Sequence, residues 1–435
     1  MRILVETGTH DFHNLGDVAM LQVSVARLRE LWPAAEIFVT TADPRGLRSH
    51  CPGTNPFPVE WGGAWMKPWN LAGKGQRLIP RNLRERSHII ERQICMRWPE
   101  LANQWIRCRM SRGNEIAGRA GRFVAGIRSM DLVVAAGGGY IADSFSNLAC
   151  MVLNTLGVAN SLGKRSALFG QGIGPVTSTE LSSLARRVLP RVDLIAVREG
   201  LRGTAIVEKC GGKRERIIVT GDDAIELAFD RRSEALGNGI GVNLRVATYS
   251  GIDSQHHEPV RRAIQSVGQR HAAPLIPIGI CRAVEDEDAR ALAAVLGVSK
   301  SDEDDHWSTG DVIGRIGKCR VVVTGSYHGA VFALSQGIPA VAIVGSAYYR
   351  SKFEGLADAF TEGCTLVASN ADDFESLLVS AVDAAWSRAE ETRQGLLDAA
   401  QRQIDASRSA YRRLKHFVTN RSADSGRTDR LLQGV

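Results

Sequence analysis

Short apolar runs alternate with amphipathic stretches along most of the chain, and this alternation constrains the fold more than any other feature. An apolar run typical of a buried strand at residues 3–5 is followed by a helical pattern at 17–31. Strands that alternate with helices form βαβ units, in which helices cover both faces of a parallel sheet. The apolar runs lie at 3–5, 37–39, 131–134, 167–170, 194–197 and 217–219, and in a second series at 240–242, 275–278, 321–323 and 340–344. The sequence therefore predicts an α/β protein with two Rossmann-like domains.

Polar segments mark the boundaries of these two domains. The segment DRRSEALGN, residues 230–238, separates the two series and is the best candidate for a linker. An insertion at about 61–128 interrupts the first series, and its pattern is compatible with helices. We expect an N-terminal domain over 1–232, a C-terminal α/β domain over 238–371, C-terminal helices over 372–418 and a flexible tail over 419–435.

The positive charge of the chain is concentrated in the insertion. The 435 residues carry 54 Lys and Arg against 47 Asp and Glu, a formal net charge of +7. Residues 61–128 hold 12 Arg and 2 Lys against 4 Glu, a net charge of +10, together with five of the eight Trp residues. Basic residues interleaved with aromatic ones suit nucleic acids. The segment matches no nucleic-acid-binding motif, however, so we predict no nucleic-acid partner.

The start of the chain and its cysteines indicate a protein of the cytoplasm. The N-terminus runs directly into a strand-like stretch without the features of a signal peptide. No stretch has the ~20 uninterrupted apolar residues that a membrane helix needs. The eight cysteines are scattered, with no CxxC pair and no His at metal-ligand spacing. We therefore predict a cytoplasmic protein without a metal site.

The first polar turn that could carry chemistry follows the first predicted strand. Asn14, Gly16 and Asp17 stand where a helix begins. A helix N-terminus offers free N–H groups to an anion, and a glycine allows a ligand to approach closely. The alternative interpretation is that Asn14 and Asp17 only cap the helix.

Two glycine-rich turns follow later strands of the first domain. Gly138 and Gly139 belong to a run of three glycines, and Asp143 comes four residues after this run. Gly172 and Gly174 follow the strand at 167–170. Consecutive glycines permit positive φ angles and leave backbone groups exposed at the sheet edge. A tight turn with Asp143 at the start of a helix is the alternative interpretation of the first.

Charged residues end two further strands of this domain. Arg198 follows the strand at 194–197 and could bind a phosphate or carboxylate through two hydrogen bonds. An ion pair with Glu199 is the alternative. Asp222 lies in an acidic turn after the strand at 217–219.

The most informative turn lies in the second domain. Ser326, Tyr327 and His328 follow the strand at 321–323, and Lys352 comes after the next strand. A His at the opening of a helix can act as an acid or base near an anionic ligand. Because turns after parallel strands gather at one edge of each sheet, two facing domains would place His328 and Lys352 across a cleft from Asp143 and Arg198.

In their order along the chain, these motifs resemble those of the polysaccharide pyruvyltransferase family. The motifs are NLGDVA, GGGYIAD, GQGIGP, the strand end at Arg198, GDD, and SYHG followed by GIP and YYRSK. The resemblance runs from about residue 3 to residue 360, outside the insertion. It implies a glycosyltransferase-B-like fold of two α/β domains around an active site. It also implies transfer of pyruvate from phosphoenolpyruvate onto two hydroxyls of a sugar, forming a cyclic ketal on a cell-surface polysaccharide or its lipid-linked precursor.

The resemblance implies roles for individual residues. His328 is expected to act as acid or base at the donor, Arg198 and Lys352 to bind anionic groups, and Asp143 to orient or activate an acceptor hydroxyl. As catalytic residues we therefore predict His328, Asp143 and Arg198. The predicted donor-binding residues are Ser326, Tyr327, Lys352, Gly172 and Gly174, and the other cleft residues are Asn14, Gly16, Asp17, Gly138, Gly139 and Asp222. Phosphoenolpyruvate is the donor substrate, and no cofactor or metal is expected.

One position departs from the family pattern. Many members carry Arg two residues before the His, in an SxRxH pattern, whereas this chain carries Ser326 there. One cation is thus missing, and Lys352 or an Arg of the insertion is expected to compensate. Because acceptors in the family are often lipid-linked glycans, we expect the insertion to border the cleft and to hold the acceptor or contact the inner face of the cell membrane. A helical lobe with a solvated Arg face is the alternative.

Two other functions remain open from the sequence alone. The first is a glycosyltransferase of the same fold with a nucleotide-sugar donor, which needs an acidic residue for the ribose hydroxyls in the second domain. The acidic run at 285–288 is interpreted instead as a solvated helix start. The second is a non-catalytic protein that binds glycans or nucleic acid, supported only by the insertion.

Overall fold

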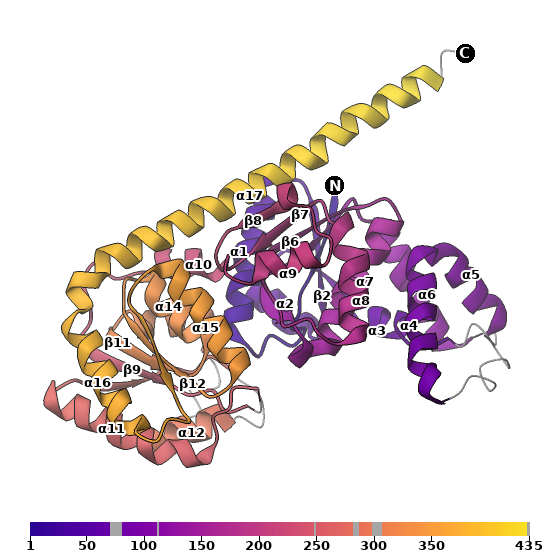
Figure 1. The fold of residues 1–435 in the computed structure, drawn as a ribbon. Coiled ribbons are helices and arrows are strands. Elements are labelled where there is room, and N and C mark those ends of the chain that lie inside the picture. Colours follow the sequence, from indigo (N-terminus) through magenta and orange to yellow (C-terminus); the bar gives the residue numbers. More distant parts are fainter. Residues whose placement is uncertain (70–80, 111–112, 248, 282–286, 298–306, 433–435) are drawn as a thin grey trace.

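Two parallel sheets, one in each domain, form the framework of the molecule (Figure 1). The computed structural model describes residues 1–69, 81–110, 113–247, 249–281, 287–297 and 307–432, without the side chains of 81–86 and 420–432. The first sheet has the order β3-β2-β1-β4-β6-β7-β8, with β5 beside β6. Its strands are β1 (Arg2–Glu6), β2 (Glu36–Thr41), β3 (Asn55–Pro58), β4 (Leu132–Ala135), β5 (Gly138–Ile141), β6 (Arg165–Ile173), β7 (Leu194–Val197) and β8 (Ile217–Val219).

Helices cover both faces of this sheet, which explains why its strands are continuously apolar. On one face, Leu4 and Val133 pack with the helices of the 115–188 region. On the other face, Val5 and Val134 pack with helices from both ends of the chain. The helices on the first face are α6 (Glu115–Arg128), α7 (Ser146–Ser161) and α8 (Thr179–Val188), and those on the second include α1 (Leu15–Leu31), α2 (Pro44–His50) and α17 (Ala389–Leu432). Two short helices, α9 (Gly203–Lys209) and α10 (Ala224–Asp230), follow β7 and β8.

The second sheet has five strands in the order β10-β9-β11-β12-β13. These are β9 (Gly239–Asn243), β10 (Leu275–Pro277), β11 (Cys319–Thr324), β12 (Ala340–Val344) and β13 (Cys364–Ala368). Residues of α11 (His257–Arg270), α12 (Glu287–Leu296) and α16 (Phe374–Ser387) pack on one face. Residues of α13 (Thr309–Ile316), α14 (Tyr327–Ser335), α15 (Ala347–Phe360) and α17 pack on the other. All strand pairs described in both sheets are parallel.

The described part of the insertion forms a helical lobe at the end of the first domain that lies away from the second domain (Figure 1). Arg92 of the lobe forms an ion pair with Glu180 of α8, and the Gln93 amide donates a hydrogen bond to the Ser183 hydroxyl (2.7 Å). No helix among the described residues is long and apolar enough to span a membrane. The helices of the lobe are α3 (Val59–Trp65), α4 (Arg81–Arg97), α5 (Pro99–Arg109) and α6.

Helix α17 runs along both domains (Figure 1). Its first half contributes Leu396 and Ala400 to the core of the second domain, and further on Tyr411 and Leu414 join the core of the first. The residues from 419 onward, for which we expected a flexible tail, continue this helix to Leu432. One helix thus ties the two domains together.

The order of the strands places a crevice at the edge where the two domains meet. The first sheet reverses its winding between β1 and β4, and the second between β9 and β11. Ligands of open α/β sheets bind at the carboxyl ends of strands next to such a reversal. The start of α1 also contacts the second domain directly, because the Leu15 amide donates a hydrogen bond to the Ile280 carbonyl (2.9 Å).

Candidate active site

Two adjoining cavities lie where the carboxyl ends of the two sheets face each other. One, of about 330 Å³, is called here the Arg198 cavity and is lined by Gly172, Gly174, Arg198, Tyr348 and Lys352, among others. The other, of about 260 Å³, is called here the His328 cavity and is lined by Asn14, Asp17, Ser326, Tyr327, His328 and Lys352, among others. Lys352 and Gly139 line both cavities, so the two are parts of one cleft.

The turn before α1 both caps the helix and forms a wall of the cleft. The Asn14 side-chain oxygen accepts hydrogen bonds from the amides of Gly16 (3.0 Å) and Asp17 (3.4 Å), as a cap does. Gly16 lies against the ring of His328 from the other domain, since a Cβ at this position would come within 2.0 Å of that ring. Burial raises the pKa of Asp17, while the nearby His328 and Lys352 act in the opposite direction.

The three-glycine turn is held in place by a glutamine of the neighbouring strand. The Gln171 amide donates hydrogen bonds to the Ala136 carbonyl (2.5 Å) and the Tyr140 hydroxyl (2.8 Å). A Cβ at Gly138 would come within 2.3 Å of the Tyr140 ring, and one at Gly139 within 2.6 Å of the Lys352 amine and 2.9 Å of the Arg198 guanidinium. The glycine at 139 therefore makes room for two cations that converge on one point.

Arg198, Asp222 and His328 form a buried polar group at the floor of the cleft. The Asp222 carboxylate lies 3.5 Å from the Arg198 guanidinium and 3.7 Å from His328 Nε2. Burial by itself would raise the pKa of Asp222, but contact with His328 and the charge of Arg198 outweigh it and lower that pKa. The guanidinium also lies over the Tyr327 ring, 4.0 Å from its centroid, and against Gly172, where a Cβ would come within 2.5 Å. The arrangement holds Arg198 in one orientation at the cleft wall.

Lys352 projects from α15 into a cage of tyrosines. Its amine lies 5.0 Å from the ring centroid of Tyr348 and 5.4 Å from those of Tyr327 and Tyr349. Burial, followed by the charge of Arg198, lowers the pKa of Lys352 to about 7. The Tyr348 hydroxyl donates a hydrogen bond to the Gly139 carbonyl across the cleft (2.9 Å). Lys352 can therefore gain or lose a proton near neutral pH.

Arg245 is a cleft residue that the sequence reading missed. It lines the His328 cavity beside Tyr249 and Ser326. Its guanidinium forms an ion pair with Asp288 (2.6 Å) and donates a hydrogen bond to the Tyr249 hydroxyl (3.0 Å). Arg245 follows β9 by two residues, so the rule that found Arg198 applies here too. Unlike Arg198, which directly follows its strand, Arg245 is separated from β9 by Leu244, and the prediction did not include it.

Two expectations for acidic residues differ from the structure. Asp143 does not belong to the cleft constellation: its carboxylate accepts hydrogen bonds from the Thr177 amide (2.8 Å), the Thr177 hydroxyl (2.6 Å) and the Ser178 amide (3.1 Å). These bonds outweigh partial burial and lower the pKa of Asp143. Asp288, expected in a solvated helix start, is instead buried against Arg245. Glu287, the first residue of α12, is exposed as expected, and residues 285–286 lie outside the described residues.

The remaining predicted positions shape the backbone of the cleft. Gly174 has a φ of +110°, which a side chain rarely permits, and lines the Arg198 cavity. The Ser326 amide donates a hydrogen bond to the Asn243 side-chain oxygen (3.1 Å), which fixes the turn before His328. The structure thus brings together all the predicted cleft residues except Asp143, with Gly138 behind the cavity wall.

The fold is shared with solved structures of low sequence identity. UDP-GlcNAc 2-epimerase from Methanocaldococcus jannaschii is 11% identical with a TM-score of 0.56, covering 96% of this chain and 100% of its own. Anabaena Alr3699/HepE in complex with UDP is 13% identical with a TM-score of 0.53, covering 97% and 100%. A glycosyltransferase from Rickettsia africae is 8% identical with a TM-score of 0.52, covering 96% and 98%. These likenesses confirm the predicted fold class, two α/β domains facing a cleft in the glycosyltransferase-B manner.

The sequence itself matches one family. The family model described as polysaccharide pyruvyl transferase covers residues 14–346, which include the cleft turns from Asn14 to His328. No curated protein matches the chain.

Proposed function

Because the chain belongs to the polysaccharide pyruvyl transferase family and is therefore an enzyme, a pyruvyltransferase, we propose that it transfers pyruvate from phosphoenolpyruvate to two hydroxyls of a sugar. The product is a cyclic ketal on a cell-surface polysaccharide or on its lipid-linked precursor. The observation that carries this proposal is the convergence of Arg198 and Lys352 on Gly139. Two cations at one point of a buried cleft are suited to a small ligand with two anionic groups.

The charges around Lys352 favour an anionic donor. Burial lowers the pKa of Lys352 to about 7, and Arg198 adds to this shift because two cations repel each other in the cleft. A bound phosphate or carboxylate removes this repulsion and stabilises the protonated amine. Phosphoenolpyruvate carries both groups, so one ligand can occupy the Arg198 cavity and keep Lys352 charged.

The reaction balances without any further reactant. A proton adds to the methylene carbon C3 of phosphoenolpyruvate, which leaves a cationic centre at C2, and the first sugar hydroxyl bonds to C2 and loses its proton. The second hydroxyl then bonds to C2, the C2–O bond to phosphate breaks, and inorganic phosphate leaves with the second proton. His328, buried at the junction of the domains beside Asp222, is the group we assign to proton transfer at the donor.

The cation missing at Ser326 has a replacement in the same cavity. Arg245 and Lys352 both line the His328 cavity next to Ser326. No Arg of the insertion is among the described residues that line either cavity. We therefore assign the compensating charge to Arg245 and Lys352, from the second domain, instead of to the insertion.

The lobe offers a surface for the membrane at which a lipid-linked acceptor is presented. Ile90 and Ile94 project from α4, Leu101 projects from α5, and Trp98 lies at the junction of these two helices; all four are exposed, and Leu101 is 63% exposed. We call these four residues the apolar stripe. Arg97, Arg107 and Arg109 of the same two helices are exposed and form no ion pair with a carboxylate among the described residues, although Arg109 lies over the Trp105 ring. Apolar side chains next to unpaired cations are suited to the surface of an anionic bilayer. A second copy of the lobe fits less well, since two surfaces of the same charge repel. We propose a cytoplasmic enzyme that contacts the inner membrane face through this stripe.

Incubation with phosphoenolpyruvate and a panel of free and lipid-linked glycans tests the enzymatic proposal. We expect phosphate release together with a gain in acceptor mass equal to one ketal-linked pyruvate. In thermal unfolding, phosphoenolpyruvate should raise the melting temperature, whereas UDP-sugars should not. Stabilisation by UDP-sugars alone would favour the glycosyltransferase alternative.

Two variants locate this activity in the cleft. Arg198→Met should abolish stabilisation by phosphoenolpyruvate, and His328→Ala should abolish turnover while donor binding remains. His416→Ala, which changes an exposed histidine of α17, is the matched control and should leave both unchanged. Full turnover in His328→Ala would contradict the assigned role.

A further inference from the structure

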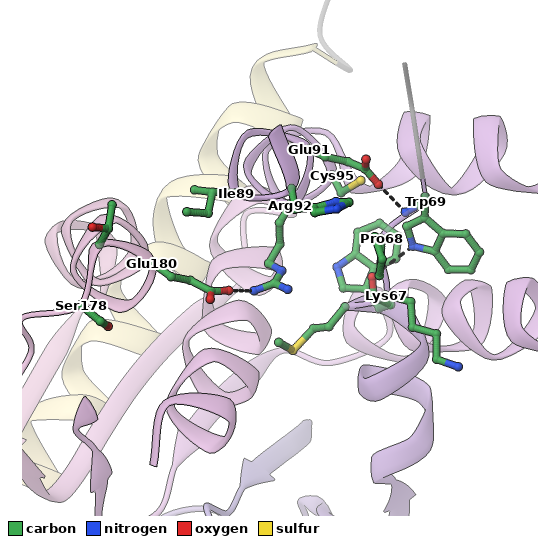
Figure 2. Close-up of a pocket in the computed structure, with 13 residues that line it drawn as sticks. Lys67, Pro68, Trp69, Ile89, Glu91, Arg92, Cys95, Ser178 and Glu180 are labelled. Atoms are coloured by element: carbon green, nitrogen blue, oxygen red, sulfur yellow. Dashed lines mark hydrogen bonds and ion pairs between the residues drawn. The ribbon is translucent and has the colours of Figure 1, made fainter. Parts of the chain in front are cut away.

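A third cavity, of about 500 Å³, lies between the lobe and the first domain (Figure 2). We call it the lobe cavity. Its walls come from the segment 65–69 after α3, from one face of α4 over 88–95 and from the start of α8 at 178–180. Cavities of this size accommodate a small organic ligand or a few sugar rings, and a mixture of aromatic and polar walls is typical of binding sites.

Two tryptophans form the apolar side of the lobe cavity, and the structure holds both in place. The Trp69 indole N–H donates a hydrogen bond to the Trp65 carbonyl (3.2 Å), and its backbone amide donates one to the Glu91 carboxylate. Trp65 stacks on Phe123 of α6, with 6.2 Å between the ring centroids. Figure 2 shows Trp69 and Lys67 on one side of the cavity and Glu180 on the opposite side. Rigid aromatic walls bind apolar ring faces at little cost in conformational entropy.

Among the described residues that line the lobe cavity, two cations stand beside two carboxylates. Arg92 reaches from α4 to Glu180, with which it forms an ion pair (Figure 2), and the other two are Lys67 and Glu91. A nucleotide or a lipid pyrophosphate would need an excess of cations, which the described lining residues do not provide. The walls suit a ligand that is uncharged, rich in hydrogen-bonding groups and apolar on its ring faces.

One buried polar atom of the cavity has no partner. The Nδ1 atom of His88, a lining residue, is buried and without a hydrogen-bond partner among the described residues. Buried polar atoms are nearly always hydrogen-bonded, to protein, water or a ligand. The hydroxyls of Ser178 and Thr179 line the opposite wall. A sugar ring supplies hydroxyls that can bond to such groups.

A short stretch of chain connects a wall of the catalytic cleft with a wall of the lobe cavity. Pro175 lines the Arg198 cavity, and Ser178, three residues later, lines the lobe cavity. Three residues span at most about 11 Å. Asp143 fixes the connection between them, because its carboxylate binds the amides of Thr177 and Ser178. Lining residues of the two cavities therefore lie within the length of a few sugar rings of each other.

We propose that the lobe cavity binds a neutral sugar residue of the acceptor glycan, a few rings away from the sugar that receives the pyruvate. This assignment rests on the proposed function and adds to it a site for acceptor recognition. It also gives Asp143 a role as a positioning residue that shapes the acceptor site through the turn at 177–178.

The test blocks the cavity without disturbing the core. Thr179 is exposed at the first position of α8, so Thr179→Trp fills the cavity from its rim. Arg186→Trp places the same side chain on an exposed position of the same helix, outside the lining, and is the matched control. His88→Phe keeps the ring shape and removes the unpartnered nitrogen. The probes are neutral disaccharides of glucose, galactose, mannose and N-acetylglucosamine, titrated by calorimetry without phosphoenolpyruvate.

The wild type should bind at least one of these disaccharides. Thr179→Trp should weaken that binding at least tenfold and His88→Phe should weaken it measurably, whereas Arg186→Trp and His328→Ala should bind normally. Failure of every disaccharide to bind, or equal binding in Thr179→Trp, overturns the proposal. Disaccharide binding is measured without the donor, so it does not depend on the proposed transfer activity. If only the transfer proposal is wrong, turnover is absent while the disaccharide still binds and Thr179→Trp still weakens that binding.

Discussion

Lys352 is the side chain of the cleft whose charge depends most on what surrounds it. Its pKa is lowered to about 7, chiefly by burial, and this holds a cation near the midpoint of its titration at neutral pH. The groups that act on it are Arg198 and Arg245, which favour the neutral amine, and Asp17 and Asp222, which favour the charged one. An anionic ligand shifts this balance toward the charged form, so donor binding and proton uptake are linked.

We predict that the affinity for phosphoenolpyruvate falls as the pH rises from 7 to 9. Over this range the donor phosphate stays ionised, while the amine of Lys352 loses its proton and its charge. The dissociation constant, measured by calorimetry, should rise by up to about tenfold per pH unit. Lys352→Met should bind more weakly at pH 7 and lose the slope. The same slope in Lys352→Met would assign the titration to another group.

At the scale of single residues, the rule for parallel strand ends predicted most of the cleft. It brought together Asn14, Arg198 and His328, which are far apart in the sequence, because their strands end at facing edges. It failed for Asp143 because the partners of a carboxylate depend on how a loop folds back, here the turn at 177–178. Arg245 was missed because it lies two residues beyond the end of its strand and not directly at the end, as Arg198 does. The lobe cavity could not be predicted, because the segments that line it, 65–69, 88–95 and 178–180, are far apart in the sequence.

At the scale of elements, Tyr411 is a central contact of helix α17 with the first domain, beside the ion pair of Arg408 with Glu226 and the apolar contacts of Leu414. Tyr411 stacks on Phe169 with 3.7 Å between the ring centroids. Its hydroxyl donates a hydrogen bond to the Asp223 carboxylate (3.1 Å) and lies 2.7 Å from the Ser24 hydroxyl. Burial raises the pKa of Asp223 to about 6. The folded state therefore binds this proton more tightly than the unfolded state does. The resulting stabilisation is complete at pH values below the ordinary carboxyl pKa, and it is lost as the pH rises through 6.

We therefore predict that Tyr411→Phe destabilises the protein more at pH 8 than at pH 5. At pH 8 Asp223 is ionised, and the variant removes the hydrogen bond that the Tyr411 hydroxyl donates to the buried carboxylate, which costs about 1–3 kcal/mol of stability. At pH 5 the protonated carboxyl group depends less on this hydrogen bond. Urea unfolding at both pH values measures the difference. Arg412→Ala, an exposed neighbour on the same helix, is the control. An equal loss at both pH values would mean that Asp223 is not the group involved.

The alternation of apolar runs predicted the order of most strands of both sheets, but it missed β3, β5 and β13. It did not predict that the end of the chain returns to the first domain. Residues such as Leu396 and Tyr411 lie on one continuous helix but in the cores of different domains. The apolar pattern of a helix shows that one face is buried, and it contains no information about which sheet covers that face.

At the scale of the whole molecule, the membrane contact that we propose for the apolar stripe would give the protein a preferred orientation at a bilayer. We predict that the enzyme binds vesicles containing phosphatidylglycerol and not vesicles of phosphatidylcholine alone, and that 0.5 M salt releases it. Each arginine near an anionic surface contributes about 1 kcal/mol, and salt screens this attraction. Co-sedimentation measures the bound fraction.

Variants of the stripe separate this binding from nonspecific adhesion. Ile94→Asp combined with Leu101→Asp should reduce the bound fraction severalfold while phosphoenolpyruvate binding remains. Leu377→Asp changes an exposed leucine of the second domain and should have no effect on sedimentation. Equal losses in both proteins would indicate that the stripe has no special part in membrane binding.

The contact between Gly16 and His328 has a consequence for engineering. A Cβ on Gly16, in the first domain, would come within 2.0 Å of the ring of His328, in the second. The two domains are thus fitted to each other at His328, and a chimera that takes each domain from a different relative must preserve this fit. The lobe is no easier to exchange, because Ile106 and Phe123 of the lobe belong to the same hydrophobic core as Leu4 and Val133 of the first sheet. A graft of the lobe must therefore carry the residues that it packs against.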